Sequence, residues 1–438
     1  MSHSSPQSRR RFLQQSAGAV GAGLLLPDWM ADLSYGYQPE NKSKNDRPLF
    51  GAIGVGGRGT AIMNNAKQFA DLVAVCDVDS KHAERARQNS DAEAYSDYRK
   101  LLERQDIDVV TIGTPDHWHT KICIEALQAG KDVYCEKPLT LTIEEGQKLI
   151  QVVKETGKIL QVGTQQRSEM GGVFLRAVAT VRSGQLGKLK NITVSLPLST
   201  AVGGPFPTSE PPENLDWDYW LGQTPKVDYC PQRCHFHFRW WFEYSGGIVT
   251  DWGAHHMDIA QWAMNMDHSG PRTIDGSETE MPKIENGYNT PKHPKIKYTY
   301  DGDIELEITA GDEFVLFEGE NGRIKVNRGR VVGKPIEDQD ADKSLQDKIN
   351  QIIAEELYPY KHARNHMANF FDCVKTRRQP VSDVVSQHRS ASACHLGNIS
   401  CRLGRKLTWD PEKEEFIGDD EANAMRSRPQ REPYQIDV

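Results

Sequence analysis

The chain has 438 residues and a formal net charge of −8. This length is enough for two domains with large cores, and the negative charge, together with the lack of a DNA-binding motif, argues against a nucleic-acid partner. No apolar run reaches the roughly 18 residues of a membrane span, and the eight cysteines form no C-x-x-C pair. We therefore expect neither a membrane span nor a disulfide framework.

The N-terminus carries the pattern of an export signal. Arg9, Arg10, Phe12 and Leu13 precede a mildly apolar, Gly- and Ala-rich stretch at 17–26, in the order of a twin-arginine signal. The stretch is too short to cross a bilayer, and no clean cleavage motif follows it. We expect export by the twin-arginine route to the periplasm. The alternative is a basic N-terminus beside a short apolar helix.

A glycine-rich turn follows an apolar strand pattern that begins at Leu49, and a helical pattern then leads to a second apolar run that ends before Asp77. Gly54 allows a sharp turn, Gly56 leaves room for a pyrophosphate, and Gly59 lets the helix pack closely. The helix start offers free N–H groups to an anion. Strand, turn, helix and terminal acid together predict a dinucleotide-binding Rossmann unit rather than an ordinary glycine turn.

The acid at the end of the second strand indicates which dinucleotide binds. The carboxylate of Asp77 is placed to accept hydrogen bonds from the adenosine ribose and to repel the 2′-phosphate of NADP. We therefore expect NAD as the cofactor. Arg58 and Lys81 would soften the repulsion, so NADP stays possible.

Alternating helix and strand patterns continue beyond Asp77. A strand at 109–112 runs into the sequence TPDHWH at 114–119, and a strand at 132–135 runs into Glu-Lys-Pro at 136–138. Ligands lie at the carboxyl ends of the strands in a parallel sheet, so both segments should border the cofactor. The residues expected to bind it are Gly54, Gly56, Gly57, Arg58, Gly59, Asp77, Thr114, Pro115, His119, Glu136 and Lys137.

The glycine turn, the TPDHWH segment and the Glu-Lys-Pro segment resemble the family of glucose–fructose oxidoreductase, inositol dehydrogenase and their relatives, the Gfo/Idh/MocA family. The resemblance covers nearly the whole chain after residue 48, and its later half is most similar to exported members typical of planctomycetes and related bacteria. It implies an α/β fold with an N-terminal Rossmann domain and a C-terminal α+β domain that holds a large, open, mostly antiparallel sheet. It also implies that Lys137 lies beside the reacting hydroxyl.

A second chemical centre is predicted at 246–258. Asp251 and His255 are four residues apart, and a helix that began near Asp251 would place them on one face. There the carboxylate would raise the basicity of the imidazole and orient it as a general base. The family pattern G-G-x-x-x-D-x-G-x-H is matched in full and puts His255 in the base position, whereas His256 is expected to be structural. The expected catalytic residues are Lys137, Asp251 and His255.

Residues 197–245 predict a long irregular insert rich in proline and aromatic residues, of a kind that is often a lid or a binding loop. Aromatic faces and Arg239 would suit a sugar. The alternative is that the tryptophans fill the core beneath the loop. The candidate substrate-binding residues are Arg167, Arg239 and Trp240.

Histidines and cysteines gather around the insert, but their spacing fits no common zinc pattern. We therefore expect no metal. The residues weighed for this role are Cys230, Cys234, His235, His237, His255 and His256.

The remaining patterns predict short strands at 296–300, 304–309, 314–318, 322–326 and 330–332, separated by glycine turns. They read as an antiparallel sheet with one face on helices; in relatives the free face pairs subunits, which implies a homodimer or homotetramer. Helices are expected at 362–376 and 385–403, the second returning to the first domain. The expected parts are a signal and linker at 1–45, the Rossmann domain at 46–165, a substrate and oligomerisation domain at 166–410, and a charged tail at 411–438.

The expected function is NAD(P)-dependent hydride transfer between the nicotinamide and a secondary hydroxyl of a sugar, cyclitol or glycoside. Export adds an alternative, because free NAD is not expected outside the cytoplasm. A retained cofactor would then serve a redox-neutral glycosidase, lyase, epimerase or sugar–sugar oxidoreductase. A third interpretation is a cofactor-loaded sugar-binding protein without turnover.

Overall fold

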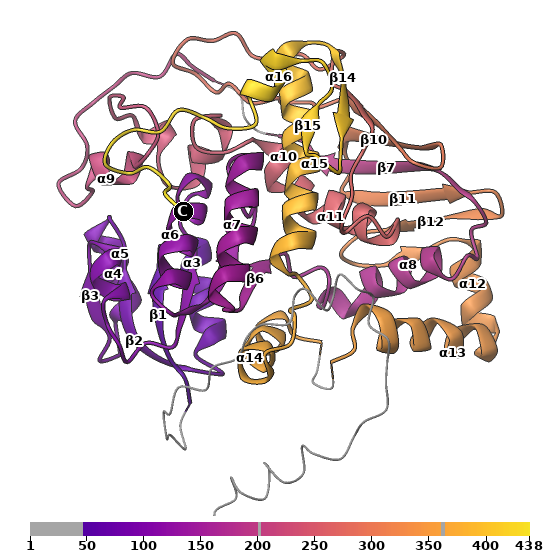
Figure 1. Cartoon of the computed structure of the whole chain (residues 1–438), viewed down its shortest axis with the longest axis horizontal. Helices are drawn as coiled ribbons and strands as arrows, with labels where there is room; N and C mark the ends of the chain where they lie inside the picture. The colour runs from indigo at the N-terminus through magenta and orange to yellow at the C-terminus, as the bar shows by residue number, and fades with distance from the viewer. Residues whose placement is uncertain (1–46, 200–202, 361–363) are drawn as a thin grey trace, which may run out of the picture. The chain divides into compact units, whose positions relative to one another are not determined.

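The computed structural model describes residues 47–199, 203–360 and 364–438. The expected twin-arginine segment lies outside these residues. The described chain is built on two β-sheets, drawn in indigo and magenta for the first and mainly in orange for the second (Figure 1). Within the described residues, no helix combines the length and the apolar character that crossing a membrane requires.

The first sheet is parallel throughout. In sheet order its strands are β3 (Glu93–Tyr95), β2 (Asp71–Cys76), β1 (Leu49–Ile53), β4 (Val109–Ile112), β5 (Asp132–Glu136) and β6 (Leu160–Gly163). Strands β4 to β6 are buried along their whole length, as expected of parallel strands covered on both faces. The strand order reverses between β1 and β4, and ligands bind beyond the carboxyl ends of strands at such a point.

Helices connect the strands of this sheet, and the first of them starts at the glycine turn. These helices are α3 (Gly57–Ala66), α4 (Ser80–Arg87), α5 (Tyr98–Leu102), α6 (Asp116–Gln128) and α7 (Ile143–Thr156). Gly54 has a φ of 72°, and a Cβ atom on Gly59 would lie 1.7 Å from the Gly54 carbonyl oxygen. Only glycine therefore allows β1 and α3 to approach so closely.

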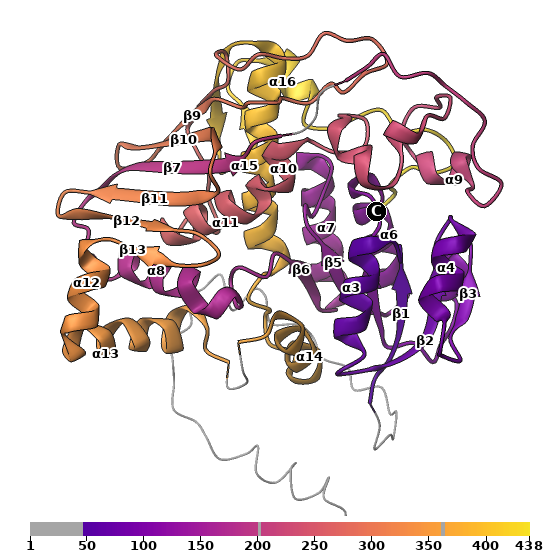
Figure 2. The same ribbon diagram turned by 180° about the vertical axis from the view of Figure 1, so that it is seen from behind.

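The second sheet is mixed and mostly antiparallel, as expected, with one parallel pair between β7 and β10. In sheet order its strands are β13 (Val331–Val332), β12 (Gly322–Val326), β11 (Phe314–Gly319), β7 (Leu189–Pro197), β10 (Ile304–Gly311), β9 (Ile296–Tyr300), β8 (Thr273–Asp275), β14 (Lys406–Asp410) and β15 (Glu415–Phe416). Alternate residues such as Val194, Ile308 and Phe317 are fully buried. Helices α8, α11 and α15 pack on one face, and Figure 2 looks onto the other.

The remaining helices of the described residues are α8 (Val173–Arg182), α9 (Trp217–Leu221), α10 (Ile248–Asp251), α11 (Gly253–Ala263), α12 (Lys334–Ala341), α13 (Lys343–Ile352), α14 (His366–Thr376), α15 (Val384–Leu403) and α16 (Asp420–Ala424). Helix α14 packs in the core of the first sheet, and Tyr219 of α9 packs on Tyr98 and Trp118 of the first sheet's helices. The described residues also contain four short 3₁₀ or π segments: η1 (Met170–Gly172), η2 (Pro231–Arg233), η3 (His235–Trp240) and η4 (Ile353–Leu357). Helix α15 packs between α7 of the first sheet and α11 of the second (Figure 1), so the expected return to the first domain is observed.

One helix boundary differs from the expectation. The helix expected from residue 362 begins at His366, because the Asn365 side chain accepts a hydrogen bond from the N–H of Ala368 and caps the helix there. The C-terminal segment, expected to wrap the surface, runs back across the first sheet's helices. Lys121 Nζ donates to a backbone carbonyl of this segment at 2.7 Å, and Lys148 Nζ donates to another at 3.1 Å.

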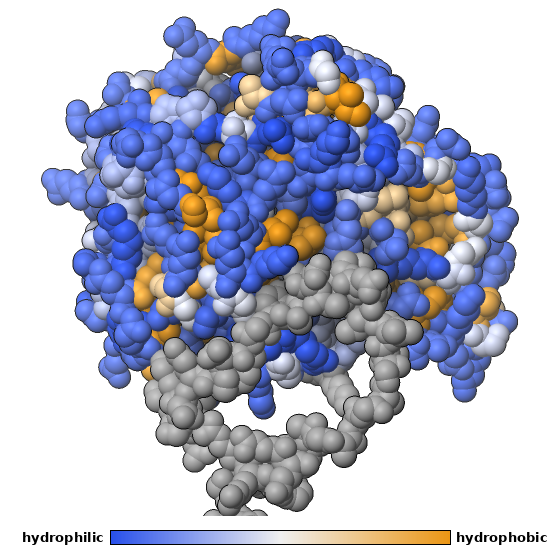
Figure 3. Space-filling view, in the orientation of Figure 1, coloured by the Kyte–Doolittle hydropathy of each residue, from blue (hydrophilic) through white to orange (hydrophobic). Residues whose placement is uncertain are grey.

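The surface seen in the orientation of Figure 1 is mainly hydrophilic, with small separate apolar patches (Figure 3). Exposed strand residues of the second sheet include Lys297, Arg323 and Lys325. This sheet therefore has the alternation of apolar and polar residues that is typical of an antiparallel sheet with one open face.

Candidate active site

A cavity of about 830 Å³ lies at the carboxyl ends of the first sheet's strands and extends to the second part of the chain. Its volume lies in the upper part of the range usual for ligand and cofactor sites. The first sheet contributes Gly54, Gly56, Gly57, Arg58, Asp77, Thr114, Pro115, Glu136 and Lys137 to its wall. The second part contributes Arg239, Asp251, His255 and Arg328. Most residues expected from the sequence to bind cofactor or to act in catalysis thus meet in one place.

The cofactor half of this cavity fits a dinucleotide. A Cβ atom on Gly57 would meet nothing within 4 Å, so the turn leaves open space where a pyrophosphate would lie. The buried Oγ1 of Thr114, on the cavity wall, has no protein partner. His119 does not line the cavity; its ring lies 2.9 Å from the Thr114 carbonyl and 2.7 Å from the Pro138 carbonyl. It therefore supports the two turns that border the site.

Asp77 lies at the end of β2, where the ribose is expected. Its Oδ2 accepts the N–H of Val55 at 2.9 Å, and its Oδ1 accepts the N–H of Asp79 at 2.9 Å. Oδ2 also faces His82 Nδ1 at 3.5 Å, whereas Oδ1 keeps a further lone pair for a ribose hydroxyl. Asp77 therefore fixes the glycine turn as well as offering an acceptor to the cofactor.

Arg58 and Glu136, both expected at the cofactor, form an ion pair with each other. Arg58 Nε lies 2.8 Å from Glu136 Oε1, and Glu136 is 4% exposed. Burial acts to lower the pKa of Arg58, but the charge of Glu136 outweighs it and the pKa is raised. The pair links α3 to the end of β5 beside Lys137.

The side-chain nitrogen of Lys137 contacts two oxygen atoms of Asp251. Its Nζ lies 2.5 Å from Asp251 Oδ1 and 3.0 Å from the Asp251 carbonyl oxygen. The peptide bond from Lys137 to Pro138 is cis. The lysine at the end of β5 therefore reaches across to the end of α10.

The expected pairing of Asp251 with His255 is wrong. The helix is interrupted at Trp252, between α10 and α11. The Asp251 carbonyl accepts from Lys137, and the N–H of His255 donates to the Trp252 carbonyl at 3.0 Å instead. The two side chains have separate partners, and Asp251 orients Lys137 rather than the imidazole.

His255 is oriented by a backbone carbonyl. Its Nδ1 lies 3.0 Å from the carbonyl oxygen of Thr164, and since a carbonyl only accepts, Nδ1 carries the hydrogen. Nε2 is left with its lone pair, the form a general base requires. His256 lies outside the cavity wall; it is fully buried, with Nδ1 3.2 Å from the Ser195 carbonyl, which agrees with its expected structural role.

The surroundings of His255 keep its imidazole neutral, and those of Asp251 keep its carboxylate ionised. Burial, and then the positive charges of Lys137 and Arg328, hold the pKa of His255 well below its usual range. Burial alone would raise the pKa of Asp251, but Lys137 and Arg239 outweigh it and lower the pKa. At neutral pH the site therefore presents a neutral imidazole beside an ammonium–carboxylate pair.

Asp116 and Arg328 line the cavity, but neither was selected as a site residue from the sequence. Asp116 is 5% exposed, accepts from Ser245 Oγ at 2.5 Å, and has its pKa raised to about 7 by burial. Arg328 lies 4.3 Å from the Trp252 ring centroid, and its Nε donates to Gln166 Oε1 at 3.0 Å. Asp116 stands within the TPDHWH segment and was available as a candidate, whereas Arg328 follows a short strand and carries no local signal.

Two of the three candidate substrate residues lie elsewhere. Arg167 is 2% exposed, and its guanidinium pairs with Asp258 at 2.6 Å and Asp267 at 2.8 Å, so its charge is already neutralised inside the core. Trp240 is 6% exposed, packs in the second sheet's core and is not part of the cavity wall. Arg239 does line the cavity, with Nε 3.8 Å from Asp251 Oδ2.

The fold and this cavity are those of an NAD-binding protein with a Rossmann domain and a second α/β domain. Residues 49–164 match the "Oxidoreductase family, NAD-binding Rossmann fold" of the Gfo/Idh/MocA proteins. Residues 204–436, more than half of the chain, match the family's "Oxidoreductase family, C-terminal alpha/beta domain". The chain therefore belongs to the Gfo/Idh/MocA oxidoreductase family.

Curated relatives match part of the chain. A "Glycosyl hydrolase family 109 protein" of Shewanella putrefaciens is 34% identical over 207 residues, which cover 41% of this chain and 44% of the relative. An "Inositol 2-dehydrogenase" of Salmonella typhimurium is 33% identical over 144 residues, 32% of this chain and 42% of the relative. The chain thus spans less than half the length of these relatives.

Solved structures share the fold over most of the chain. The WlbA dehydrogenase of Bordetella pertussis, in complex with NADH and UDP-GlcNAcA, has a TM-score of 0.61 at 16% identity, covering 84% of this chain and 99% of that one. An aldose-aldose oxidoreductase of Caulobacter crescentus has a TM-score of 0.60 at 14% identity, covering 83% of this chain and 99% of the other. At this identity the likeness establishes the architecture alone.

Proposed function

We propose that the protein transfers a hydride between NAD and a secondary hydroxyl of a sugar, cyclitol or glycoside. The observation that carries the proposal is the meeting of Lys137, Asp251 and His255 in the cavity that also contains the glycine turn. An alcohol that is oxidised loses a proton and a hydride, so it needs a base beside a hydride acceptor. NAD, when bound, supplies that acceptor.

In this mechanism His255 is the base. Its Nε2 takes the proton of the hydroxyl, while the Thr164 carbonyl holds the ring in the required tautomer. Lys137 donates to the same oxygen and stabilises the negative charge that develops there. Asp251 holds the ammonium group in place through the contact at 2.5 Å. Asp116, with its pKa near 7, is a further proton donor or acceptor on the wall.

A second candidate is a redox-neutral reaction, such as glycoside cleavage, elimination, epimerisation or sugar-to-sugar transfer, with NAD retained. The observation that favours it is that residues 214–216 of the insert, called the strap below, are hydrogen-bonded to the start of α4. The N–H of Ser80 donates to the Asn214 carbonyl at 2.9 Å, and the N–H of Asp216 donates to the Val78 carbonyl at 3.1 Å. A strap on this edge would slow cofactor release. The relatives named as glycosyl hydrolase family 109 proteins agree with this candidate.

A cofactor-loaded binding protein without turnover is the third candidate. It would need the glycine turn and the sugar contacts but no proton acceptor at the hydroxyl. The presence of His255 beside the Lys137–Asp251 pair argues against it.

Localisation and assembly complete the proposal. Arg9, Arg10, Phe12 and Leu13 support export by the twin-arginine route to the periplasm. Cell fractionation tests this, because replacing both arginines by lysine should leave the folded protein in the cytoplasm, and unchanged export would refute it.

The open face of the second sheet is proposed to pair subunits. Light scattering of the purified protein would reveal a dimer or tetramer, or refute the pairing by showing a monomer.

Mass spectrometry of the purified folded protein separates the two enzymatic candidates. A retained dinucleotide would favour the redox-neutral reaction. An empty site that reduces added NAD in the presence of a sugar or cyclitol would favour the simple dehydrogenase. A protein that neither retains nor binds NAD would contradict both.

A further inference from the structure

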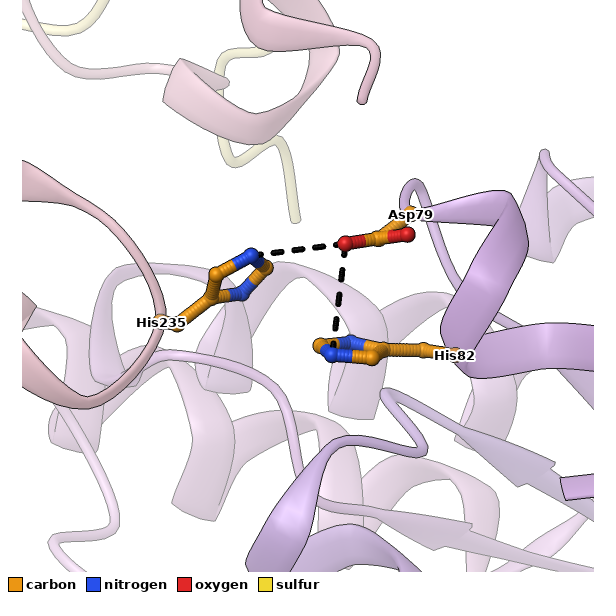
Figure 4. Close-up of side chains that lie close together, drawn as sticks. All are labelled: Asp79, His82 and His235. Carbon is orange, nitrogen blue, oxygen red and sulfur yellow. Dashed lines mark ion pairs between the residues drawn. The ribbon is translucent and has the colours of Figure 1, made fainter. Parts of the chain in front are cut away.

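Two histidines and an aspartate lie close together and face one another (Figure 4), and both histidines line the cavity. Asp79 caps the start of α4, His82 lies in that helix's first turn, and His235 opens η3 in the insert. One ligand atom from each residue lies within 4.8 Å of the other two. The cluster thus joins segments that are more than 150 residues apart in the sequence.

Asp79 is 4% exposed, and its two carboxylate oxygens have different surroundings. Oδ1 accepts the N–H of Lys81 at 2.9 Å and Nδ2 of Asn214 at 2.7 Å. Oδ2 faces the two imidazoles, 3.3 Å from His235 Nε2 and 3.9 Å from His82 Nε2. Both distances exceed the usual length of an N–H···O hydrogen bond.

The same distances are near those between ligands of one metal ion. With bonds of about 2.0–2.2 Å, two ligands of a tetrahedral zinc ion lie roughly 3.3–3.6 Å apart. The edge from Asp79 Oδ2 to His235 Nε2 measures 3.3 Å, and the edge to His82 Nε2 measures 3.9 Å. All three ligand atoms lie within 4.8 Å of one another, so the two imidazoles would have to move closer together to bind one tetrahedral ion.

A further carboxylate stands behind His82. Asp77 Oδ2 lies 3.5 Å from Nδ1 of this ring, so it favours the hydrogen on Nδ1 and leaves the Nε2 lone pair directed toward Asp79. Carboxylate, histidine and metal in this order are the usual support for a metal-binding imidazole. His235 is about half exposed, with 46% of its side chain accessible, which leaves solvent access for a fourth ligand.

The donor set selects the class of ion. Two imidazole nitrogens and one carboxylate suit zinc and its neighbours in the first transition row, whereas magnesium and calcium prefer oxygen ligands. We propose that Asp79, His82 and His235 bind a divalent ion of the zinc class, which fastens the insert to α4. The proposal departs from the expectation of no metal, which weighed His235 with other histidines and with cysteines but not with Asp79 or His82.

A metal ion held by Asp79, His82 and His235, called the clasp below, would slow cofactor exchange. This consequence rests on NAD binding at the glycine turn. His82 and His235 line the same cavity as Asp77, and η3, which begins at His235, also carries Arg239. An ion that holds η3 against α4 closes the adenosine end of the cavity. NAD should therefore leave more slowly from the metal-loaded protein.

Calorimetry on the purified full-length protein, stripped with a chelator, tests the site. Titration with Zn²⁺ should show one equivalent bound, and His235→Ala, His82→Ala and Asp79→Asn should each weaken the affinity by at least about 100-fold. Asparagine still caps a helix, so Asp79→Asn removes the charge while α4 keeps its start. Circular dichroism checks that each variant is folded.

The matched control is His237→Ala, because His237 lies two residues from His235 on the same segment but outside the cluster. It should bind Zn²⁺ as the parent does. The site is refuted if the parent binds no stoichiometric Zn²⁺, or if His235→Ala binds it equally well. Co²⁺ bound at the site should give the visible absorption of a four-coordinate ion, and an octahedral spectrum would overturn the tetrahedral assignment.

The clasp is tested by NAD release in stopped flow. Zn²⁺ should slow release by about tenfold from the parent and leave release from His235→Ala unchanged. Zn²⁺ binding without any change in release would refute the clasp. If Zn²⁺ binds but NAD does not, the metal site is supported and the proposed oxidoreductase function fails.

Discussion

The Nζ atom of Lys137 lies 2.5 Å from Oδ1 of Asp251, across 114 residues of sequence. The lysine stands at the turn after β5, and the aspartate ends α10. This ion pair joins the NAD-binding sheet to the second part of the chain at the cavity wall. The Asp251 carbonyl, at the junction between α10 and α11, accepts from the same ammonium group.

The first prediction concerns this pair. Lys137→Ala should lower turnover by about 10²-fold to 10⁴-fold, since it removes the charge beside the reacting oxygen. Asp251→Asn should lower turnover less, because the lysine keeps its charge and loses only its ionic partner. Steady-state kinetics measure both effects, and NAD fluorescence titration serves as the control for intact cofactor binding. Full turnover in Lys137→Ala would rule out its catalytic role.

The second prediction concerns cofactor choice. Asp77→Asn removes the charge that repels a 2′-phosphate and keeps one acceptor for the neighbouring N–H groups. Binding of NAD should weaken by about tenfold, the worth of a hydrogen bond to a charged group, and NADP should gain relative to NAD. Calorimetry with both dinucleotides provides the measurement. Tighter binding of NADP than of NAD by the unmutated protein would show that Asp77 does not select the cofactor.

The third prediction separates two arginines. Arg167→Ala leaves the fully buried Asp258 without its ion-pair partner and leaves Asp267 with only Arg182, 3.9 Å away, so the free energy of unfolding should fall by about 3–5 kcal/mol. Arg239→Ala changes a cavity residue with 21% of its side chain exposed, and should raise KM with little loss of stability. Urea unfolding and steady-state kinetics test the contrast. The opposite pattern would restore Arg167 as a substrate residue.

The fourth prediction concerns acid stability. Burial lowers the pKa of His395 from 6.5 to about 3, so the unfolded chain binds a proton that the folded chain excludes. The stabilisation is present above pH 6.5 and is lost as the pH falls toward 3. Between pH 7 and pH 5 this site should cost about 2 kcal/mol.

His395→Gln should remove that share of the pH dependence. Its amide still donates to the Thr140 carbonyl, which lies 3.1 Å from Nε2 in the parent. Thermal unfolding at both pH values gives the comparison. An unchanged difference in Tm between pH 7 and pH 5 would mean that His395 is protonated in the folded protein.

The features predicted correctly from the sequence are local ones. The glycine turn, the helix at 385–403 and the Glu-Lys-Pro turn each depend on residues close together in the sequence, where backbone preference and capping decide the structure. Asp383 and Gly404, which cap α15 at its two ends, are examples.

The features that were missed or mistaken depend on distant residues. The Asp251–His255 pairing was inferred from a spacing of four residues, whereas the carboxylate pairs with a lysine 114 residues away. Arg167 was considered free for substrate because Asp258 and Asp267 lie more than 90 residues further on. His235 lies beside α4 only because the insert folds back over that helix. Spacing rules apply within one element and do not report which elements meet.

The most direct measurement is reduction of NAD by a panel of sugars, cyclitols and glycosides, followed by nicotinamide absorbance in the parent, His255→Ala and His256→Ala. We predict that His255→Ala binds NAD but turns over about 10²-fold to 10⁴-fold more slowly, whereas His256→Ala, changed outside the cavity, retains most of its chemical rate. A parent that reduces NAD, together with a His255→Ala variant that reduces it equally fast, would contradict the account.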